Sequence, residues 1–383
     1  MNESENNVVH KLCTKLGFPS LADVLAKVAW RDVQPILVQV MRDRLENKSV
    51  HELLAEYENK FGFYGVSDID QRNLHEFVGR FYSVLPDTYQ VPELAPITPI
   101  GLNALLSQVS QDVSLSSIRA SEVVSDPTTP LALHCAYERK KMMSDKDRLH
   151  DSVCLATMHR VLRLQSFDSS KGYMQHFRLL GLCSGGRDTV HATFFVKHII
   201  EHISVWLDFV NHLNEHGYVF HNVTVKLSDI RVAEMLIAHL SLNREVLNRH
   251  SLDEEYDFFE SNNISFPKEA LSIDEIPEES IGVHGLTKLK DSLRTSEERI
   301  IKPLRDRYPN VRFSFDFARK AGLGYYEHLC YHIFAENKDG RDVQLADGGS
   351  VDWLSKLLSS KKERMVTSGF GCELIQNLFK SSP

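Results

Sequence analysis

Residues 162–183, LRLQSFDSSKGYMQHFRLLGLC, join two strand-like segments through a polar loop. The full segments, CLATMHRVLRLQSF (154–167) and QHFRLLGLCSGG (175–186), are rich in the apolar and β-branched residues that favour strands. The loop between them, DSSKGY (168–173), carries small and charged residues. This order predicts two antiparallel strands connected by a loop.

Three further stretches show strand, turn and helix patterns. The first, EVVSDPTTPLALHCAYER (122–139), is typical of a strand, an Asp-Pro-Thr turn and a helix. The second combines AGLGYYEHLCYHI (321–333) with DGGSVDWL (347–354), in which glycines accompany strand-like runs. The third, SGFGCELI (368–375), leads from a glycine-containing run into a final helix.

Together and in this order, the four stretches resemble the class II aminoacyl-tRNA synthetases, and within them the histidyl branch and its non-synthetase relatives. The resemblance extends over roughly residues 90–376. It implies an α+β fold, with a class II synthetase-like antiparallel sheet of six or seven strands flanked by helices. Because such cores are dimers in the family, the resemblance also implies a homodimer.

The resemblance carries a substrate site over onto residues of this chain. Asp126, or Pro127 beside it, falls at the acid that holds the substrate's amino group, and Thr128 falls at the threonine that assists it. Tyr325 and Tyr326 match the two tyrosines of the histidyl signature Arg-Gly-Leu-Asp-Tyr-Tyr. The other implied substrate-binding residues are Leu179, Cys183, Gly348 and Gly349.

A nucleotide site is implied in the same way. Arg163 matches the arginine that clamps the α-phosphate and the substrate carboxylate, and it is the expected catalytic residue. Phe177 falls where the family stacks the adenine ring. Gly371 and Glu373 match the start of motif 3, where Glu373 could hold magnesium. ATP with magnesium is therefore the implied cofactor.

Several positions depart from the family's pattern. Ala321, Ser350 and Leu374 stand where the family has arginines. Fixed arginines stabilise charge on the α-phosphate, and losing one preorganised group of this kind costs about 2.7–4 kcal/mol of transition-state stabilisation. Arg319 or Lys320, next to Ala321, could substitute. Without such substitution, we expect ordinary adenylation to be poor.

The histidine-specific features are also changed. Leu179 and Cys183 replace a glutamine and a glutamate that recognise the imidazole, and each N–H left unpaired would cost about 1–3 kcal/mol. The chain ends about eight residues after SGFGCELI, where a histidyl synthetase continues into an anticodon-binding domain. We therefore expect neither histidine as a substrate nor charging of tRNA.

Each assigned residue also has a purely structural interpretation. Asp126 and Thr128 could cap the helix that follows them. Arg163 could be an ordinary strand arginine, and the aromatic residues could serve packing alone. The glycines could be required by tight backbone geometry, with contact to a ligand only a secondary consequence.

Composition limits the classes of function. The chain has 383 residues with a net charge of -8 and a pI near 6.1, which argues against nonspecific nucleic-acid binding over the whole surface. Six scattered cysteines without a C-x-x-C pattern indicate reduced, mostly packing thiols. The start of the chain has no pattern of a secretory signal, and no run reaches about 18 apolar residues. We expect a cytoplasmic protein with no membrane association.

The expected organisation has three parts. Residues 1–88 form a helical N-terminal domain or arm, which ends at the proline-rich stretch 86–100. Residues 89–228 and 311–383 form the synthetase-like core. Residues 229–310, helical and acidic in pattern, form an inserted subdomain.

The stretch HIIEH (198–202) has the inverted order of a zinc protease motif. Residues four apart share a helix face, so His198 and His202 could bind one zinc ion with Glu201 as the base. A zinc site needs a third ligand, and no residue marks itself as one. Because the surrounding helix has a broad apolar face, we expect a packing or solvated histidine pair, with no zinc and no metal ligands.

Two functions follow from these patterns. The first is a histidyl-tRNA synthetase-like paralogue without tRNA charging, similar to the regulatory subunit of ATP phosphoribosyltransferase. It would bind a small amino-acid-like or nucleotide ligand and act as a regulatory or partner subunit, with the N-terminal helices as a docking surface. The second is a divergent enzyme, an ATP-dependent ligase that activates a carboxylate as an adenylate and passes it to an acceptor other than tRNA.

Overall fold

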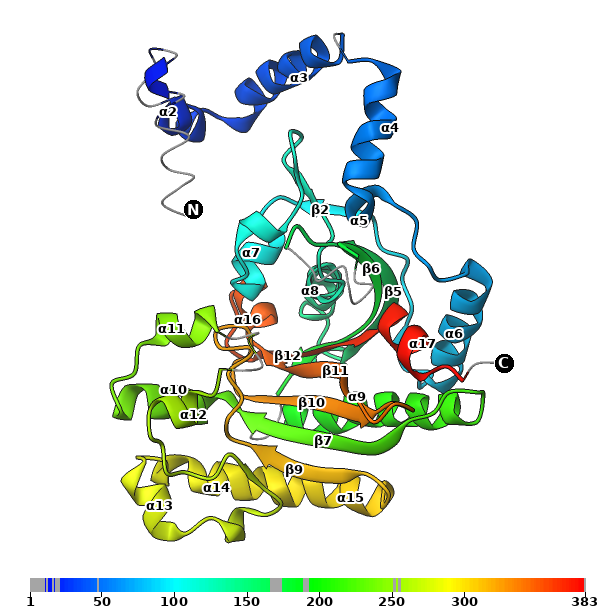
Figure 1. The fold of residues 1–383 in the computed structure, drawn as a ribbon. Helices are drawn as coiled ribbons and strands as arrows, with labels where there is room; N and C mark the ends of the chain where they lie inside the picture. Colours follow the sequence, from blue (N-terminus) through cyan, green and yellow to red (C-terminus); the bar gives the residue numbers. More distant parts are fainter. Residues whose placement is uncertain are drawn as a thin grey trace.

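The computed structural model describes residues 11, 13–15, 17, 21–46, 48–165, 174–188, 193–250, 253 and 256–381. The described chain is built around a nine-stranded sheet with the strand order β1-β5-β6-β12-β11-β10-β7-β9-β8 (Figure 1). The bounds of these strands are β1 Tyr89–Gln90, β5 Val153–Leu162, β6 His176–Arg187, β7 His221–Asp229, β8 Glu269–Ala270, β9 Arg312–Asp316, β10 Leu329–Glu336, β11 Asp342–Val351 and β12 Glu363–Gly371.

The six strands from β5 to β7 in the sheet order pair antiparallel with one another. Strands β1 and β9 pair parallel with β5 and β7, and β8 pairs antiparallel with β9 at the edge. The predicted class II synthetase-like antiparallel sheet is confirmed. It is wider than the expected six or seven strands because β1, β9 and β8 extend its two edges.

The two strands predicted from residues 154–186 are β5 and β6, which pair antiparallel over the whole length of β5. Val161 lies opposite Phe177, and Arg160 lies opposite Arg178. The predicted loop DSSKGY lies outside the described residues. This strand pair brings the expected phosphate-binding and ring-stacking residues to one end of the sheet.

Helices cover both faces of the sheet. Successive residues of β5 alternate between two apolar clusters: Cys154 and Ala156 pack with α9 (Thr193–Asn214), whereas Val153 and Leu155 pack with α8 (Thr128–Met142) and α16 (Trp353–Leu357). Helix α9 buries the apolar face that its sequence predicted, namely Phe194, Phe195, Ile199, Ile203 and Leu207, with Ile200 partly buried.

The N-terminal part is helical, as predicted. Helix α6 buries Leu74, Phe77, Val78 and Phe81, and it packs against α9. Helices α2, α3 and α4 extend away from the sheet as an arm (Figure 1). The capping box predicted for α4 is confirmed, because Ser49 Oγ accepts from the Glu52 amide and Glu52 accepts from the Ser49 amide. The helix bounds are α2 Leu21–Lys27, α3 Trp30–Glu46, α4 Val50–Asn59, α5 Phe61–Tyr64 and α6 Gln71–Val84.

Between β7 and β9 the chain forms a mainly helical insertion, as expected. It contributes β8 to the sheet, and Phe258, Phe259 and Phe266 join the same apolar cluster as α9. Its elements are α10 Ile230–His239, α11 Arg244–Arg249, α12 Phe258–Ser261, η3 Ile273–Glu275, α13 Glu278–Val283, α14 Thr287–Ser296, η4 Glu297–Ile301 and α15 Lys302–Arg307.

The remaining elements lie near the end of the sheet where the cavities described below open. They are β2 Ile97–Pro99, α7 Leu102–Ser107, η1 Gln111–Val113, β3 Ser116–Ser117, β4 Ser121–Val123 and α17 Glu373–Phe379. Strands β2, β4 and β3 form a separate small sheet. All six cysteines are buried free thiols, which agrees with the predicted packing role. Among the described residues, no helix combines the length and the apolar character that crossing a membrane requires.

Candidate functional site

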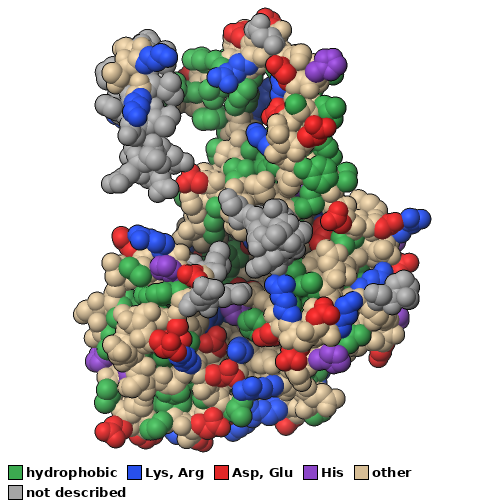
Figure 2. All heavy atoms as spheres, viewed as in Figure 1, with side chains coloured by type: hydrophobic (Ala, Val, Ile, Leu, Met, Phe, Trp, Pro, Cys, Tyr) green, Lys and Arg blue, Asp and Glu red, His purple; other side chains and the backbone are tan. Residues whose placement is uncertain are grey.

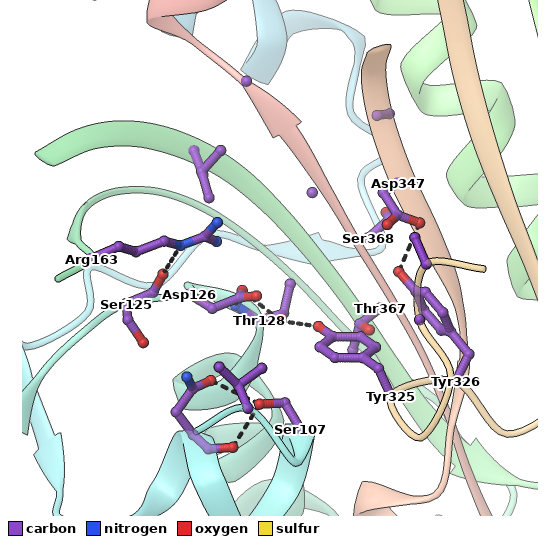
Figure 3. Close-up of a pocket in the computed structure, with 18 of the residues that line it drawn as sticks. Ser107, Ser125, Asp126, Thr128, Arg163, Tyr325, Tyr326, Asp347, Thr367 and Ser368 are labelled. Carbon is purple, nitrogen blue, oxygen red and sulfur yellow. Dashed lines mark hydrogen bonds between the residues drawn. The ribbon is translucent and has the colours of Figure 1, made fainter. Parts of the chain in front are cut away.

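A cavity of about 570 Å³ lies between α7, the start of α8, the end of β5, the turn around residues 321–326 and strands β11 and β12 (Figure 3). The strand pairing places β11 and β12 side by side, so that their residues form one wall. The predicted site residues that line this cavity are Asp126, Thr128, Arg163, Leu179, Tyr325, Tyr326 and Gly371.

A chain of hydrogen bonds joins Tyr325, Thr128 and Asp126 across the cavity (Figure 3). The Thr128 hydroxyl donates to Asp126 Oδ1 at 2.7 Å, and the Thr128 amide donates to the same oxygen at 2.9 Å. Because the Thr128 proton is used there, the Tyr325 hydroxyl donates to Thr128 Oγ1 at 3.2 Å. Burial, together with the charge of Asp126, raises the pKa of Tyr325 well above its ordinary value, so it stays a donor.

This chain leaves one oxygen of Asp126 for a ligand. Oδ1 accepts both bonds from Thr128, whereas Oδ2 accepts none from the described residues. The structural interpretation is also correct in part, because the bond from the Thr128 amide is the local turn that starts α8. Asp126 thus has a fixed orientation, and its Oδ2 has no partner among the described residues at the cavity that Asp126 lines.

Arg163 is tethered next to Asp126. Its Nε donates to the Ser125 carbonyl at 2.8 Å, and its guanidinium lies 5.3 Å from the centre of the Phe177 ring. Its two terminal nitrogens make no hydrogen bond to the described residues. Arg163 is the only lysine or arginine among the described residues that line the cavity. Among the described residues, Asp126 Oδ2 and the two terminal nitrogens of Arg163 therefore lie near one another without hydrogen-bond partners.

Asp347 carries a second negative charge on the far side of the cavity (Figure 3). Its Oδ1 accepts from Arg319 Nη2 at 2.8 Å and from the Tyr326 hydroxyl at 2.9 Å, and Oδ2 lies 3.5 Å from His332 Nε2. Burial alone would raise the pKa of the Asp347 carboxyl, but the charges of Arg319 and His332 hold it well below its ordinary value. Asp347 is therefore ionised, with about a third (35%) of its side chain exposed to the cavity.

A second cavity of about 250 Å³ adjoins the first and shares Leu179 and Gly371 with it. Phe177 and Glu373 line this second cavity, as the predicted nucleotide site requires. Arg178, Arg341 and Leu374 also line it, as do Ser67 and Asp68 from the segment before α6. The N-terminal region thus closes one side of the expected adenine position.

The carboxylate of Glu373 is already engaged. Its Oε2 accepts from the Arg178 amide at 2.5 Å, and its Oε1 lies 3.4 Å from Arg160 Nη2. Burial raises the pKa of Glu373 above its ordinary value, which weakens it as a magnesium ligand. Leu374 replaces the arginine on the other side of the adenine position.

Three predicted site residues do not line either cavity among the described residues. Cys183 is fully buried under α8, in the cluster that also holds Cys135. At Gly348 an added Cβ would meet the Ser368 side chain at 2.4 Å, and at Gly349 it would meet the Leu329 carbonyl at 2.6 Å. The two glycines therefore permit close packing of neighbouring strands, which is the structural interpretation given above.

Neither substitute for the missing arginine reaches the cavity. Arg319 is buried, and besides Asp347 it binds the Ala321 carbonyl at 2.9 Å. The Lys320 ammonium donates to the carbonyls of Asp253 and Tyr256 in the insertion. Both cations thus bind groups around the cavity without lining it, and the hypothesis that either takes the arginine's place in the cavity is wrong.

The histidines of HIIEH lie on α9 and are buried, with exposures of 1% for His198 and 0% for His202. His202 bonds to Ser184 Oγ and Ser368 Oγ, each at 3.0 Å. Burial, helped by the charge of His198, lowers the pKa of His202 to about 3, so its imidazole is neutral at neutral pH. Of the two expected alternatives, a packing or a solvated histidine pair, the burial excludes the solvated one, and His202 is a packed, hydrogen-bonded histidine.

Sequence reasoning missed Asp347, although it stands immediately before the glycine pair that was singled out. A single acid inside an otherwise apolar strand segment, LADGG, is the signal that could have found it. Thr367 and Ser368 on β12 also line the cavity and were missed. They lie across from Gly349 and Gly348 in the sheet, a register that needs the strand order.

Three solved structures are similar to this chain. They are an ATP phosphoribosyltransferase regulatory subunit/histidyl-tRNA synthetase from Bacillus halodurans (TM-score 0.55, 15% identity, 80% of this chain and 79% of that one), a histidyl-tRNA synthetase from Nostoc sp. PCC 7120 (0.60, 14%, 82% and 74%), and a histidine–tRNA ligase subunit from Alicyclobacillus acidocaldarius (0.57, 14%, 81% and 94%). No protein-family model and no curated protein sequence matches. At these identities the likeness shows the fold: the chain has a class II, histidyl-tRNA synthetase-like core.

Proposed function

We propose that this chain is a histidyl-tRNA synthetase-like paralogue that binds an amino-acid-like ligand without charging tRNA, and that it acts as a regulatory or partner subunit. One observation carries the proposal. In the part of the chain that the structure describes, the cavity keeps an unpaired oxygen of Asp126 beside the unpaired terminal nitrogens of Arg163, and Arg163 is the only cation that lines it.

The paired charges suit a zwitterion. An ammonium group can bind Asp126 Oδ2, and a carboxylate can accept two bonds from the terminal nitrogens of Arg163. Arg163 is held next to Asp126 through the Ser125 carbonyl, so the two groups cannot separate without losing that bond. This preorganisation lowers the cost of binding a small molecule that carries both charges.

The third charge in the cavity restricts the ligand's side chain. Asp347 is ionised and faces the cavity from the side opposite Arg163 (Figure 3). A ligand with an ammonium, a guanidinium or another hydrogen-bond donor at that distance would pair with it. An acidic side chain would place a second negative charge beside the Asp347 carboxylate, which costs affinity, whereas an apolar side chain would leave Asp347 with Arg319 and Tyr326 as its partners and gain nothing from it.

The same residues fit ATP less well. A triphosphate carries several negative charges, whereas the lining of the main cavity holds two carboxylates and one guanidinium. The second cavity offers the side chains of Arg178 and Arg341, but the Glu373 carboxylate is engaged by the Arg178 backbone amide and by Arg160, and Leu374 cannot stack as a cation. These features favour ligand binding over adenylation.

The partner role draws support from the N-terminal arm and from one similar structure. The arm exposes many large apolar side chains, among them Ile36, Met41, Leu45, Leu53 and Leu54, and Figure 2 shows hydrophobic side chains gathered along it. One structure of similar fold is described as an ATP phosphoribosyltransferase regulatory subunit/histidyl-tRNA synthetase. We propose that the arm contacts a second subunit, either another copy of this chain, as in a homodimer, or a different protein.

A thermal-shift experiment tests the ligand. Purified protein is heated with each of the common amino acids and their amine derivatives, with and without ATP and magnesium. A ligand at a hundred times its dissociation constant adds about 2.7 kcal/mol of stability, which is easily measured. The proposal predicts a rise in Tm with at least one such molecule, no further rise with ATP and magnesium, and no rise in Arg163→Met.

The control for this experiment is Arg364→Met, because Arg364 lies on β12 but lines neither cavity among the described residues. It should respond as the wild type does. A rise in Tm that requires ATP and deepens with a carboxylic acid, together with exchange of pyrophosphate into ATP, would show an adenylate-forming ligase and overturn the proposal.

A further inference from the structure

The HIIEH stretch acquires in the fold a neighbour that the sequence does not reveal. Cys154 on β5 brings its sulfur to the side of α9 that carries His198 and Glu201. The Cys154 sulfur, a His198 ring nitrogen and a Glu201 carboxylate oxygen all lie within 4.8 Å of one another. Thiolate, imidazole and carboxylate are the three ligand types that zinc accepts in proteins.

His198 presents one nitrogen to this cluster without a hydrogen bond. Its side chain is 1% exposed, and its Nδ1 lies 3.2 Å from Glu201 Oε2. Among the described residues this buried nitrogen has no hydrogen-bond partner. The other nitrogen, Nε2, lies 3.3 Å from Ser152 Oγ, so it can carry the proton and leave the Nδ1 lone pair free.

A chain of donors points at the Cys154 sulfur. Trp206 Nε1 donates to Ser368 Oγ at 3.0 Å, and at the other end the Ser184 hydroxyl donates to Cys154 Sγ at 3.6 Å. Because the proton of Ser184 is used on the sulfur, His202 must donate to Ser184 from Nε2 and accept from Ser368 at Nδ1. The chain therefore ends on a sulfur acceptor, and it explains why His202 is not a ligand.

We propose that Cys154 Sγ, His198 Nδ1 and one carboxylate oxygen of Glu201 bind a single zinc ion between β5 and α9. With usual zinc–ligand bonds of about 2.0–2.3 Å, tetrahedral ligands stand roughly 3.3–3.6 Å apart. The observed 3.2 Å between nitrogen and oxygen is close to this spacing. On binding, the Cys154 thiol releases its proton to solvent, and the Ser184 hydroxyl then bonds to the thiolate.

The fourth zinc ligand in this proposal is a water molecule. The Glu201 side chain is 20% exposed, so solvent reaches the cluster on that side. Because one ligand comes from β5 and two from α9, the ion would fasten the helix to the sheet. Ser368, at the other end of the donor chain, also lines the main cavity, so the site adjoins the wall of the proposed ligand site.

A comparison cluster lies at the end of α9. His212 is in the last turn of the helix, Glu215 and His216 follow its last residue, Asn214, and the three repeat the His-x-x-Glu-His order. Their ligand atoms also lie within 4.8 Å of one another. This cluster has no sulfur. It lies near the surface, and His216 Nδ1 is bonded to the His212 carbonyl at 2.7 Å. It therefore provides a matched control for weak binding by surface imidazoles.

The test is a titration of the full-length protein with Co²⁺ after treatment with a chelator, followed by absorption spectroscopy. A thiolate bound to Co²⁺ gives a near-ultraviolet charge-transfer band, which imidazole and carboxylate ligands do not. The proposal predicts one such band per chain, displaced by Zn²⁺ and lost in Cys154→Ser. Glu201→Gln should keep the band and weaken Co²⁺ binding by at least about 10-fold.

Two controls keep the test decisive. Cys183→Ser removes another buried cysteine, and His216→Ala removes the surface cluster, and both should retain the band. Absence of a thiolate band in the wild type would overturn the proposal, as would a band that persists in Cys154→Ser. If Cys154→Ser does not fold, the other two variants decide. The proposal is rejected if Glu201→Gln binds Co²⁺ as tightly as the wild type does while His216→Ala binds it more weakly.

Discussion

The buried carboxylate of Glu363 offers a quantitative test of how α8 is held against the sheet. Glu363 begins β12, and its side chain is 0% exposed. Arg139 of α8, also 0% exposed, donates to it from Nε at 3.0 Å and from Nη2 at 3.2 Å, and Arg187 of β6 donates from Nε at 3.1 Å. Glu363→Gln keeps the shape and removes the charge, which leaves the Arg139 guanidinium buried without its counter-ion.

Removing one partner of a buried ion pair costs about 3–5 kcal/mol. Unfolding entropy is about 2.1 cal/mol/K per residue, which for 383 residues gives roughly 0.8 kcal/mol/K. If the chain unfolds cooperatively, Glu363→Gln should lower the Tm by about 4–6 °C. Differential scanning calorimetry measures this at neutral pH.

The control for this variant is Glu336→Gln, because Glu336 pairs only with the exposed Asn222 among the described residues. Its Tm should change by less than about 1 °C, as expected for a surface substitution. The reasoning is refuted if Glu363→Gln and Glu336→Gln have the same Tm, because the buried ion pair would then make no net contribution to the stability of the fold.

Three other predictions concern pH and packing. The pKa of Asp347 is held below its ordinary value, so its stabilising effect is present above an unfolded pKa of about 4. The effect is lost as the pH falls towards the lower folded pKa. Asp347→Asn should therefore lower the Tm at pH 7, and its difference in Tm from the wild type should shrink below about pH 4. The folded pKa of His202, about 3, also lies below its unfolded value of about 6.5, so the wild type should lose stability relative to His202→Gln as the pH falls from about 6.5, with a limiting slope of about 1.4 kcal/mol per pH unit in urea titrations. At Gly185 an added Cβ would lie 2.3 Å from Cys135 Sγ, so Gly185→Ala should destabilise by about 1–3 kcal/mol in urea unfolding, whereas Gly79→Ala, with open space around it, should not destabilise.

The strands and the long helix were predictable because each carries its own pattern. The β5–β6 pair alternates between two apolar clusters, and α9 places its large apolar residues on one face. The widening of the sheet was not predictable in the same way. Strand β1 has two residues, and so does β8, which is too short for any periodicity to appear in the sequence.

The candidate site likewise contains residues that the sequence could identify and residues that it could not. Asp126, Thr128 and Arg163 were named through the resemblance to the histidyl branch, which rests on the turn before α8 and the end of β5, and in the structure all three line the main cavity. Asp347 was missed because the sequence marks it only as a single acid in an apolar segment, while its pairing with Arg319 and Tyr326 depends on another segment of the chain. Cys183 was misplaced relative to the cavity because the depth to which α8 covers β6 is a tertiary property.

The central claim is that the main cavity holds an amino-acid-like ligand between Asp126 and Arg163. The most direct test is isothermal titration calorimetry of the molecule that gives the largest thermal shift, against the wild type, Asp126→Asn, Arg163→Met and Arg364→Met. Each charge-assisted hydrogen bond contributes about 1.5–3 kcal/mol, so the first two variants should each bind about 10–100-fold more weakly, while Arg364→Met binds as the wild type does. Equal affinity in all four proteins would contradict the claim, because the ligand would then bind without either charge.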